Sequence, residues 1–591
     1  MITKGKPHQR NKAGYALLLT LGFLGIMLIL LASVMGWASN ESRLTARNNF
    51  YHASVAAAEG ATEMVIAQMD RDFITQSVNS DLNYYRNTTP AGFENNWPIQ
   101  FQFSDGSNNT NQTGVVSLGP SVVANLNSEF AGLYGLVSPY RVTSQAQVLN
   151  QLYPVAAGVS QDIQLACIPV FQFAIFYTLN LEINPGPQMI ITGKVHSNGT
   201  LYTAPVAGLE YKDTVTAVGQ ILNTREVNDP QYGSGKVAPV YDGAHTEKVS
   251  ALTLPVGSSN SPASVEQILK PPPVGEDPNS ELGQQRYYNK ADLIVTTTAS
   301  GVHVKAGAWK NFAPIAADVT NGSVTSYSFI NTAGSFVDLR ENKPTITTEI
   351  DVGALISWVN NPNKGGALNG QAQSLLTHGL DSIYVDDQRS APGDLTVVRV
   401  SNGAVLPSSG LTVATQLPLY VKGNFNLNNG DTTPGQTNTS MTKPASLVGD
   451  AITILSQNWN DNDAGTTLSQ RPAANTTVNA ALIGGIVETT AMGGNKYYSG
   501  GVENFPRFLE DWNPNNSSKT LTYNGSMVVM FDSQRATSFW QSPGGSGYYN
   551  APTRKWAFDV NFLNQAKLPP GTPQVRKLVR GQWNIVAVST P

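Results

Sequence analysis

The feature that most constrains this chain is a long apolar run near its start. From Ala13 to Asn40 no residue is charged, and a helix needs about 20 apolar residues to cross the hydrocarbon core of a bilayer. A secretory signal has a shorter apolar region, about 7 to 15 residues, followed by a small-x-small cleavage site. The run offers one weak site of that kind, Gly36 to Ala38. It therefore predicts a retained transmembrane helix rather than a cleaved signal.

Charges on either side of the run predict its orientation, because lysine and arginine beside a membrane segment tend to remain cytoplasmic. Four basic residues and no acid precede the run, whereas acids and bases balance after it. The basic residues before it are Lys4, Lys6, Arg10 and Lys12, and after it Glu41 and Glu59 balance Arg43 and Arg47. We expect a single-pass protein whose bulk lies outside the cytoplasm.

The helix is expected to continue beyond the apolar run. From Glu41 to Val78 there is no proline and one glycine, and mostly apolar residues recur at spacings of three, four and seven, as on one helical face. These residues are Leu44, Tyr51, Val55, Ala58, Thr62, Val65, Met69 and Phe73. The simplest prediction is one helix over residues 15–78, apolar and then amphipathic. An anchor with a separate juxtamembrane stalk is the alternative.

The order of a basic leader, Ala13-Gly14, Tyr15, an apolar helix and "AAAEGATE" around Glu59 resembles the N-terminal region of PilX-type pilus-assembly proteins. These belong to the type IV pilin-like group, and the resemblance covers residues 1–75. It implies that a prepilin peptidase cuts after Gly14 and methylates Tyr15. Major pilins carry a glutamate as the fifth mature residue, where this chain has Leu19. That departure favours a minor or tip-located subunit over a main structural pilin.

The resemblance also implies a location and partners. It suggests a protein of the bacterial inner membrane whose C-terminal body is periplasmic or exposed on the cell surface or pilus. Its partners would be the membrane, other pilin-like subunits and the pilus assembly machinery. The hypothesis that follows is a non-enzymatic subunit of a type IV pilus or a secretion pseudopilus. The body would serve tip priming or adhesion to a surface glycan or protein ligand.

Composition limits the fold of the remainder. With 591 residues the chain should hold two to four domains or one long repetitive domain. Charged residues make up 13%, whereas glycine (53) and proline (35) are plentiful, which favours short strands and turns. The formal charge of -4 comes with no basic stripe, so no nucleic-acid partner is expected. The one cysteine, Cys167, excludes an intrachain disulfide and is interpreted as a small buried apolar residue.

Short strand-and-turn units recur through the body. Residues 168–203 alternate β-branched and aromatic runs with Pro-Gly and Asn-Gly turns, and similar units include "LPLYVKGNFNLNNG" and "NAALIGGIVETT". Stacking such units would bury a continuous core. The predicted fold is α+β and mainly β, with an irregular β-solenoid, or parallel β-helix, as the body. A β-sandwich is the alternative.

Changes in composition suggest domain boundaries. Between 261 and 390 a proline-rich stretch and a helix that Asp351 could cap, with Leu355, Ile356 and Trp358, indicate a small α/β insertion. The predicted segments are a basic leader (1–14), the helix (15–78), a small pilin-like α/β region (79–164), the first part of the β-rich body (165–260), the insertion (261–390) and the second part of the body (391–591). The segments "FVDLRENKPTITTEIDV", "SGGVENFPRFLEDW" and "YNAPTRKWAFDVNFLNQAKLPPGTP" resemble stretches of large, uncharacterised exported proteins.

Few residues suggest chemistry. No two of the histidines at 8, 52, 196, 245, 303 and 378 have the i, i+4 spacing of ligands on one helical face, so no metal site is expected. No nucleophile elbow, phosphate loop or dinucleotide motif occurs, so no cofactor is predicted. The best acid pair is Asp386-Asp387 beside Arg389, which suggests as an alternative an envelope-anchored, polysaccharide-active enzyme. Adjacent strand residues point to opposite faces, however, so a solvated turn is the simpler interpretation.

Aromatic residues gather in the last third of the chain. They are Trp459, Trp512, Trp540, Tyr548, Tyr549 and Trp556. Exposed rings of this kind bind sugars or protein partners, whereas buried ones fill cores. The sequence leaves both interpretations open.

Overall fold

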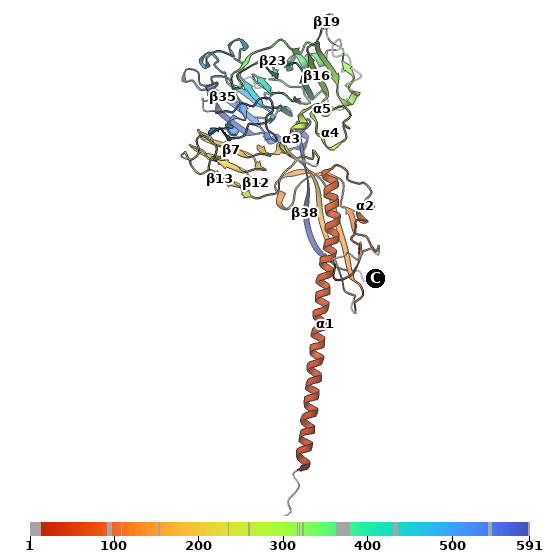
Figure 1. The fold of residues 1–591 in the computed structure, drawn as a ribbon. Coiled ribbons are helices and arrows are strands. Elements are labelled where there is room, and N and C mark those ends of the chain that lie inside the picture. Colours follow the sequence, from red (N-terminus) through yellow and green to blue (C-terminus); the bar gives the residue numbers. More distant parts are fainter. Residues whose placement is uncertain are drawn as a thin grey trace, which may run out of the picture.

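The computed structural model describes most of the chain from residue 13 to residue 588. The described ranges are 13–91, 97–107, 109–151, 154–234, 236–257, 261–315, 317, 319–321, 324–361, 379–428, 435, 437–541 and 547–588. A long helix carries a β-rich mass at one end (Figure 1). This confirms the predicted long N-terminal helix followed by a mostly β body. Residues 1–12 of the predicted leader lie outside the described ranges.

The N-terminal helix, α1, runs without a break from Ala13 to Ile74. Its 62 residues extend about 90 Å at about 1.5 Å per residue. It ends four residues earlier than predicted because Gln76 adopts a left-handed conformation with φ 59°. The amides of Gln76 and Ser77 then donate back to the carbonyls of Phe73 and Asp72, which closes the helix with a Schellman motif.

The second half of α1 packs on an antiparallel sheet. The sheet has the order β1-β4-β5-β38, with β2 and β3 also paired to β4. Its strands are β1 (Phe101–Ser104), β2 (Gly114–Ser117), β3 (Val122–Asn125), β4 (Tyr134–Val148), β5 (Ala156–Pro169) and β38 (Gln574–Val586). Buried Val65 and Met69 of the helix meet Val142, Ile163 and Leu165 of the sheet. We call the second half of α1, these six strands and their connections the head.

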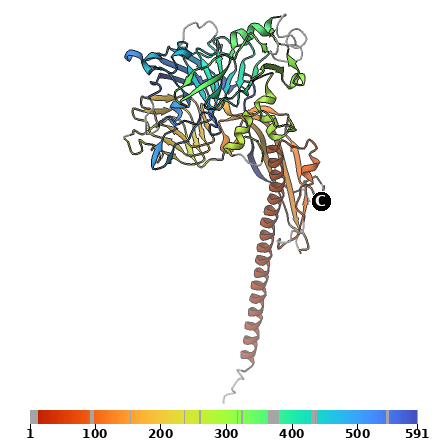
Figure 2. The same ribbon diagram turned by 45° about the horizontal axis from the view of Figure 1, so that its top comes forward.

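The last strand of the head comes from the far end of the chain. β38 pairs antiparallel with β5 from Gln574 opposite Pro169 to Val586 opposite Gly158. Residues 170–573, which we call the body, are therefore inserted between two paired strands of one sheet. Figure 2 shows the body at the upper end of α1, with β38 returning beside the first strands.

Most strands of the body pair in parallel. The largest sheet has twelve strands: β15 (His245–Glu247), β12 (Val215–Ala217), β9 (Val195–Ser197), β6 (Ile175–Tyr177), β36 (Met527–Val529), β31 (Ala481–Ile483), β28 (Ala445–Val448), β26 (Leu411–Ala414), β24 (Ser382–Asp387), β16 (Leu293–Thr298), β17 (Gly301–Ala306) and β18 (Pro314–Ile315). A seven-stranded sheet contains β21 (Ile330–Asn331), β22 (Val337–Asp338), β23 (Lys343–Asp351), β25 (Leu395–Ser401), β27 (Leu419–Lys422), β29 (Ile452–Leu455) and β34 (Pro506–Arg507).

Smaller sheets and short helices complete the body. The three-stranded sheets are β13 (Ile221–Leu222), β10 (Leu201–Thr203) and β7 (Leu181–Ile183); β14 (Val240–Tyr241), β11 (Leu209–Tyr211) and β8 (Met189–Ile191); and β30 (Thr476–Asn479), β35 (Thr520–Gly525) and β37 (Thr553–Phe558). The hairpins are β19 (Val319–Asn321) with β20 (Val324–Ser326) and β32 (Thr490–Met492) with β33 (Asn495–Tyr497). The shorter helices are α2 (Asn83–Arg86) in the head and α3 (Pro262–Glu266), α4 (Glu281–Gln285), α5 (Tyr287–Lys290) and α6 (Val352–Asn360) in the body.

The first coils of the body repeat in register. Leu181, Leu201 and Ile221 are neighbours across β7, β10 and β13, at offsets of 20 residues along the chain. The twelve-stranded sheet, by contrast, joins the two ends of the body, because β6 pairs with β36 and places Ile175 beside Met527. One apolar core runs through the stack. The body therefore begins and ends at one place, next to the head.

The range 261–390 contributes directly to these sheets. β16 and β24 are neighbours in the twelve-stranded sheet, and β24 also pairs with β26. The predicted cap of α6 is confirmed, since the side chain of Asp351 accepts a hydrogen bond from the amide of Ala354 at 2.8 Å. Leu355 and Trp358 of α6 are fully buried.

Candidate functional site

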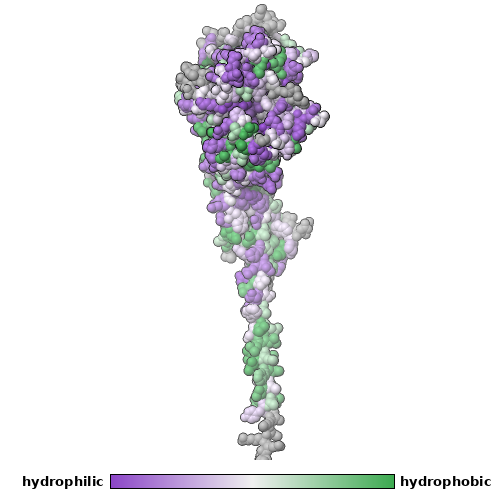
Figure 3. All heavy atoms as spheres, turned by 90° about the vertical axis from the view of Figure 1, so that its left-hand side faces the viewer, coloured by the Kyte–Doolittle hydropathy of each residue, from purple (hydrophilic) through white to green (hydrophobic). Residues whose placement is uncertain are grey.

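The first half of α1 is the most exposed apolar surface of the protein. Every large apolar side chain from Tyr15 to Trp37 is exposed, with Tyr15 at 79% and Leu19 at 59%. Within the described residues, α1 is the one helix long and apolar enough to cross a membrane. Figure 3 shows this segment as an apolar rod below the more polar head and body. The segment can serve as a membrane anchor, as predicted.

The residues singled out from the sequence lie at different levels of this helix. Gly14 and Tyr15, the predicted processing site, are at its very start. Leu19 lies one turn further and contacts no other part of the protein, as its exposure shows. Glu59 is exposed on the half of α1 that packs on the head. The structure therefore separates the predicted processing site from the head by the whole apolar segment.

Two arginines of β38 hold the second half of α1. Arg580 forms an ion pair with Glu63, with Nη2 of Arg580 2.7 Å from Oε2. Arg576 donates from Nη1 to the carbonyl oxygen of Phe73 at 3.1 Å, and its guanidinium lies 5.4 Å from the centre of that ring. Strand β38 therefore fixes the helix as well as the sheet. This contact could not be seen in the sequence because its partners are about 500 residues apart.

The acid pair proposed for catalysis is buried in a strand. Asp386 and Asp387 end β24 and are 3% and 4% exposed, so the interpretation as a solvated turn is wrong. Asp386 accepts hydrogen bonds from the side-chain amides of Gln388 and Gln416, both at 2.8 Å. Asp387 pairs with Arg389 at 2.7 Å and accepts from the hydroxyl of Thr348 at 2.7 Å. Each carboxylate has its own set of partners, which is typical of a structural role.

Histidines and the other acids form no metal centre in the part of the chain that the structure describes. His196 is buried, and its ring nitrogens lie 2.8 Å from Oγ1 of Thr216 and 2.9 Å from Oδ1 of Asn198. Burial lowers the pKa of His196 to about 4, so the ring is neutral at pH 7. His8 and His378 lie outside the described residues.

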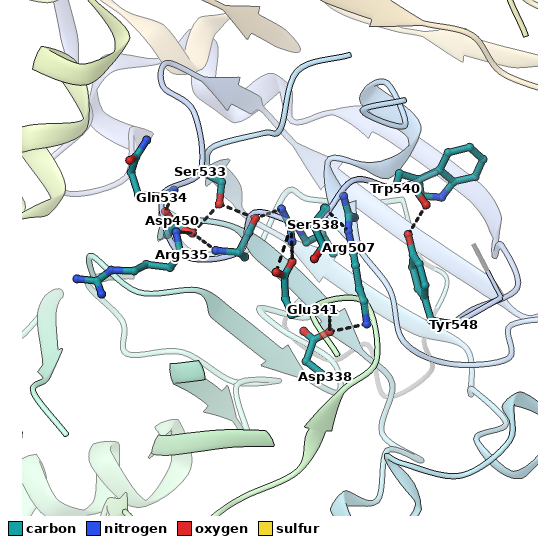
Figure 4. Close-up of polar contacts among 12 residues, drawn as sticks. Asp338, Glu341, Asp450, Arg507, Ser533, Gln534, Arg535, Ser538, Trp540 and Tyr548 are labelled. Atoms are coloured by element: carbon teal, nitrogen blue, oxygen red, sulfur yellow. Dashed lines mark hydrogen bonds and ion pairs between the residues drawn. The ribbon is translucent and has the colours of Figure 1, made fainter. Parts of the chain in front are cut away.

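The aromatic residues of the last third lie mainly in the core. Trp459, Trp512 and Tyr549 are buried, and Trp540, Tyr548 and Trp556 are partly buried. The hydroxyl of Tyr548 donates to the carbonyl oxygen of Trp540 at 2.6 Å (Figure 4). These contacts favour the interpretation as core residues. Cys167, by contrast, is only partly buried, and burial raises the pKa of its thiol.

A buried polar cluster, which no sequence signal indicated, lies where two of the quoted segments meet. Glu341, from "FVDLREN", and Arg507, from "SGGVENFPRF", form an ion pair at 2.7 Å, with side chains 1% and 5% exposed (Figure 4). Asp338 accepts from the amides of Arg340 and Glu341 at 2.8 and 2.9 Å and from the hydroxyl of Tyr420. Because Glu341 is paired with Arg507 and Asp338 is hydrogen-bonded, the cluster holds loops together rather than presenting a reactive group.

A second carboxylate organises the neighbouring loop. Asp450 is 1% exposed and accepts hydrogen bonds from the hydroxyl of Ser533 and from three successive backbone amides. Those amides belong to Gln534, Arg535 and Ala536. The carbonyl oxygen of Ala536 in turn accepts from Arg507 at 2.6 Å. The loop is thereby fixed against the Glu341–Arg507 pair (Figure 4).

Several buried glutamates have raised pKa values, among them Glu182 and Glu503. Burial raises the pKa of Glu182 to about 7, although the hydroxyls of Thr489 and Ser499 donate to it and oppose the shift. Burial also raises the pKa of Glu503 to about 7. A carboxyl group whose pKa rises on folding is more easily ionised in the unfolded chain. Protonated Glu182 therefore makes its full contribution to the stability of the fold below pH 4.5, and this contribution is lost as the pH rises through 7.

This predicts a pH-dependent effect of Glu182→Gln. The amide cannot ionise, so relative to the natural protein the variant should gain up to about 3 kcal/mol of stability between pH 5 and pH 8. Denaturant unfolding at both pH values measures the difference. Glu129→Gln, at an exposed carboxylate, is the matched control and should show no such gain. An equal response of the two variants to pH would contradict the assignment to Glu182.

Comparison with known proteins adds little. No family model matches the chain, and no curated protein matches it. Among solved structures, the competence-associated pilin ComZ from Thermus thermophilus aligns over 90% of this chain and 97% of its own, with 10% identity and a TM-score of 0.29. A similarity of that size carries no argument about function.

Proposed function

We propose that this chain is a non-enzymatic, pilin-like surface subunit that is anchored in the membrane by the first half of α1 and displays its body outside the cytoplasm. The observation that carries the proposal is the helix itself. One unbroken α1 is wholly exposed and apolar at its start and forms the spine of a folded head at its end.

The dimensions of the helix support an anchor. Tyr15 to Trp37 extends about 33 Å at about 1.5 Å per residue, which matches the hydrocarbon core of about 30 Å. The half of α1 that packs on the head begins near Phe50, beyond the end of the uncharged run at Asn40, so the apolar segment and the packed segment do not overlap. A helix of this form can leave a bilayer only by packing its apolar face elsewhere, as among the helices of a filament.

The body supports display rather than anchoring alone. It is inserted between β5 and β38, so it moves with the head as one attached unit. We interpret it as an irregular β-solenoid, since neighbouring strands pair in parallel, and not as a β-sandwich. We assign the subunit to the PilX-type group of the bacterial inner membrane. With Leu19 in place of the usual glutamate, we propose a minor position in tip priming or adhesion.

The burial of Asp386 and Asp387 is our reason for proposing that the chain is not an enzyme. The polysaccharide-enzyme alternative depended on Asp386 and Asp387 facing a cleft. Both carboxylates are buried and hydrogen-bonded, one to glutamine amides and the other to Arg389 and Thr348. No other observation on the described residues supports that alternative.

The mature N-terminus tests the proposal. Mass spectrometry of the protein from membrane and sheared-surface fractions should find chains that begin with N-methylated Tyr15. Gly14→Val should abolish this product, because the peptidase implied by the resemblance cuts after Gly14. Gly22→Val is the matched control: a side chain there meets no atom within 4 Å, and processing should continue.

Other termini would overturn parts of the proposal. An intact Met1 in every fraction would reduce α1 to a plain membrane anchor. A start at Ser39 would show that the apolar run is removed as a secretion signal. Neither product could insert a processed helix into a filament.

A further inference from the structure

A cavity of about 380 Å³ opens where the head meets the body. Its walls come from α4 and α5 of the body, from the proline-rich loop before β38, and from the first residues of β38 itself. Two basic side chains line it, Lys290 and Arg576, together with four glutamines, and no acidic side chain is part of the lining. Figure 1 places α4 and α5 close to the upper end of α1.

Lys290 lacks a counter-charge. Its side chain is partly buried, and among the described residues no carboxylate pairs with it. Its one recorded partner is the ring of Tyr287, whose centre lies 5.6 Å from Nζ. Burial lowers the pKa of Lys290 to about 8, and no neighbouring acid opposes that shift. The ammonium group is therefore charged at pH 7 and faces the cavity without an anion.

Arg576 is in a similar position. Its Nη1 donates to the carbonyl oxygen of Phe73, and its plane lies over that ring, but within the described part of the chain it forms no ion pair. Burial lowers the pKa of this guanidinium as well. Its remaining N–H groups have no recorded acceptor in the protein.

The wall beside Lys290 is fixed by the backbone. Gly571 has φ 72°, in the left-handed region, and a Cβ built there would lie 3.3 Å from Tyr287 and 3.7 Å from Cδ of Lys290. The stem of Lys290 thus packs over a glycine between prolines of the loop "LPPGTP". Gln285 and Gln574 add neutral amide donors to the same cavity.

Two uncompensated cations at one cavity, with amide donors beside them, match the needs of an oxyanion, which accepts several charge-assisted hydrogen bonds. We propose that this cavity binds a soluble oxyanion, the phosphate or carboxylate group of a small ligand, through Lys290 and Arg576. The inference is independent of the proposed role in a filament.

The position of the cavity favours a soluble ligand over a lipid headgroup. Arg576 lies at Phe73, and the apolar segment ends near Trp37. These two levels of α1 are about 54 Å apart at about 1.5 Å per residue. A headgroup in the membrane that holds the apolar segment could not reach the cavity.

Inorganic phosphate binding to the full chain in zwitterionic nanodiscs tests the inference. Calorimetry should give saturable binding, and phosphate should raise the melting temperature. Lys290→Met should weaken phosphate binding at least tenfold, because the ammonium group that would hold the anion is gone. Arg576→Gln should also weaken binding. Lys236→Met, at an exposed lysine, should leave both properties unchanged.

Competition by other anions and a change of nanodisc lipid then identify the chemical class and the source of the bound anion. Sulfate and acetate should compete with phosphate, and chloride should not. Absence of saturable binding for phosphate, sulfate and acetate would overturn the site, as would unchanged affinity in Lys290→Met. If nanodiscs with phosphatidylglycerol abolished phosphate binding, the anion would come from the lipid and the soluble ligand would be excluded.

Discussion

Val579→Asp should unfold the head and lower the free energy of unfolding by about 4 kcal/mol or more. Val579 is 1% exposed on β38 and lies opposite Gln164 of β5. It belongs to the core that joins the head to the body, together with Val137, Ala166 and Val575. An aspartate there would place a carboxylate among apolar side chains with no cation to pair with. Denaturant unfolding and the yield of intact protein measure the effect.

A control on the same strand separates this effect from a general cost of negative charge. Gln582 is exposed near the end of β38, so Gln582→Asp should change stability by less than about 0.5 kcal/mol. Similar losses for the two variants would show that burial at Val579 is not the cause. Wild-type stability in Val579→Asp would contradict the pairing of β38 with β5.

Arg507→Met should destabilise the body by about 3 to 5 kcal/mol. The substitution removes the partner of Glu341, whose side chain is 1% exposed, and leaves a buried, uncompensated carboxylate. It also removes the donor to the carbonyl oxygen of Ala536, which anchors the loop held by Asp450. Thermal and denaturant unfolding measure the loss.

The double variant Arg507→Met/Glu341→Met identifies the cause. With both charges removed and volume kept, much of the stability should return, because desolvation of an ion pair offsets most of its attraction. Arg141→Met, which breaks the exposed pair with Asp162, should cost less than about 1 kcal/mol. A double variant no more stable than Arg507→Met would mean that the arginine acts through its packing rather than its charge.

The long helix and the cap of α6 could be predicted because their signals are local. An uncharged run and a face of apolar residues specify α1 within its own sequence, and Asp351 stands directly before the residues that it caps. The end of α1 could not be placed, since the left-handed conformation of Gln76 has no glycine to mark it. The existence of these helices could therefore be predicted from the sequence more reliably than the residues at which they end.

The pairing of distant segments could not be predicted. The sequence of β38 has no pattern that identifies β5 as its partner. The 20-residue repeat of Leu181, Leu201 and Ile221 could not be recognised in the sequence because few other positions repeat with it. Because adjacent strand residues point to opposite faces, the sequence did predict that Asp386 and Asp387 would not act as a pair. It did not predict that both lie in a buried strand. Lys290 and Arg576 had no sequence signal, because their shared cavity exists only once head and body are joined.

The return of the chain to its first sheet has a consequence for biogenesis. β38 follows the body along the chain, so β5 keeps an unpaired edge until the whole body has been synthesised. The Glu63–Arg580 pair, separated by 517 positions, can form only then. A polypeptide whose synthesis stops within the body lacks β38 and cannot complete the sheet of the head. A completed sheet in the head therefore indicates that the body between β5 and β38 has been made in full.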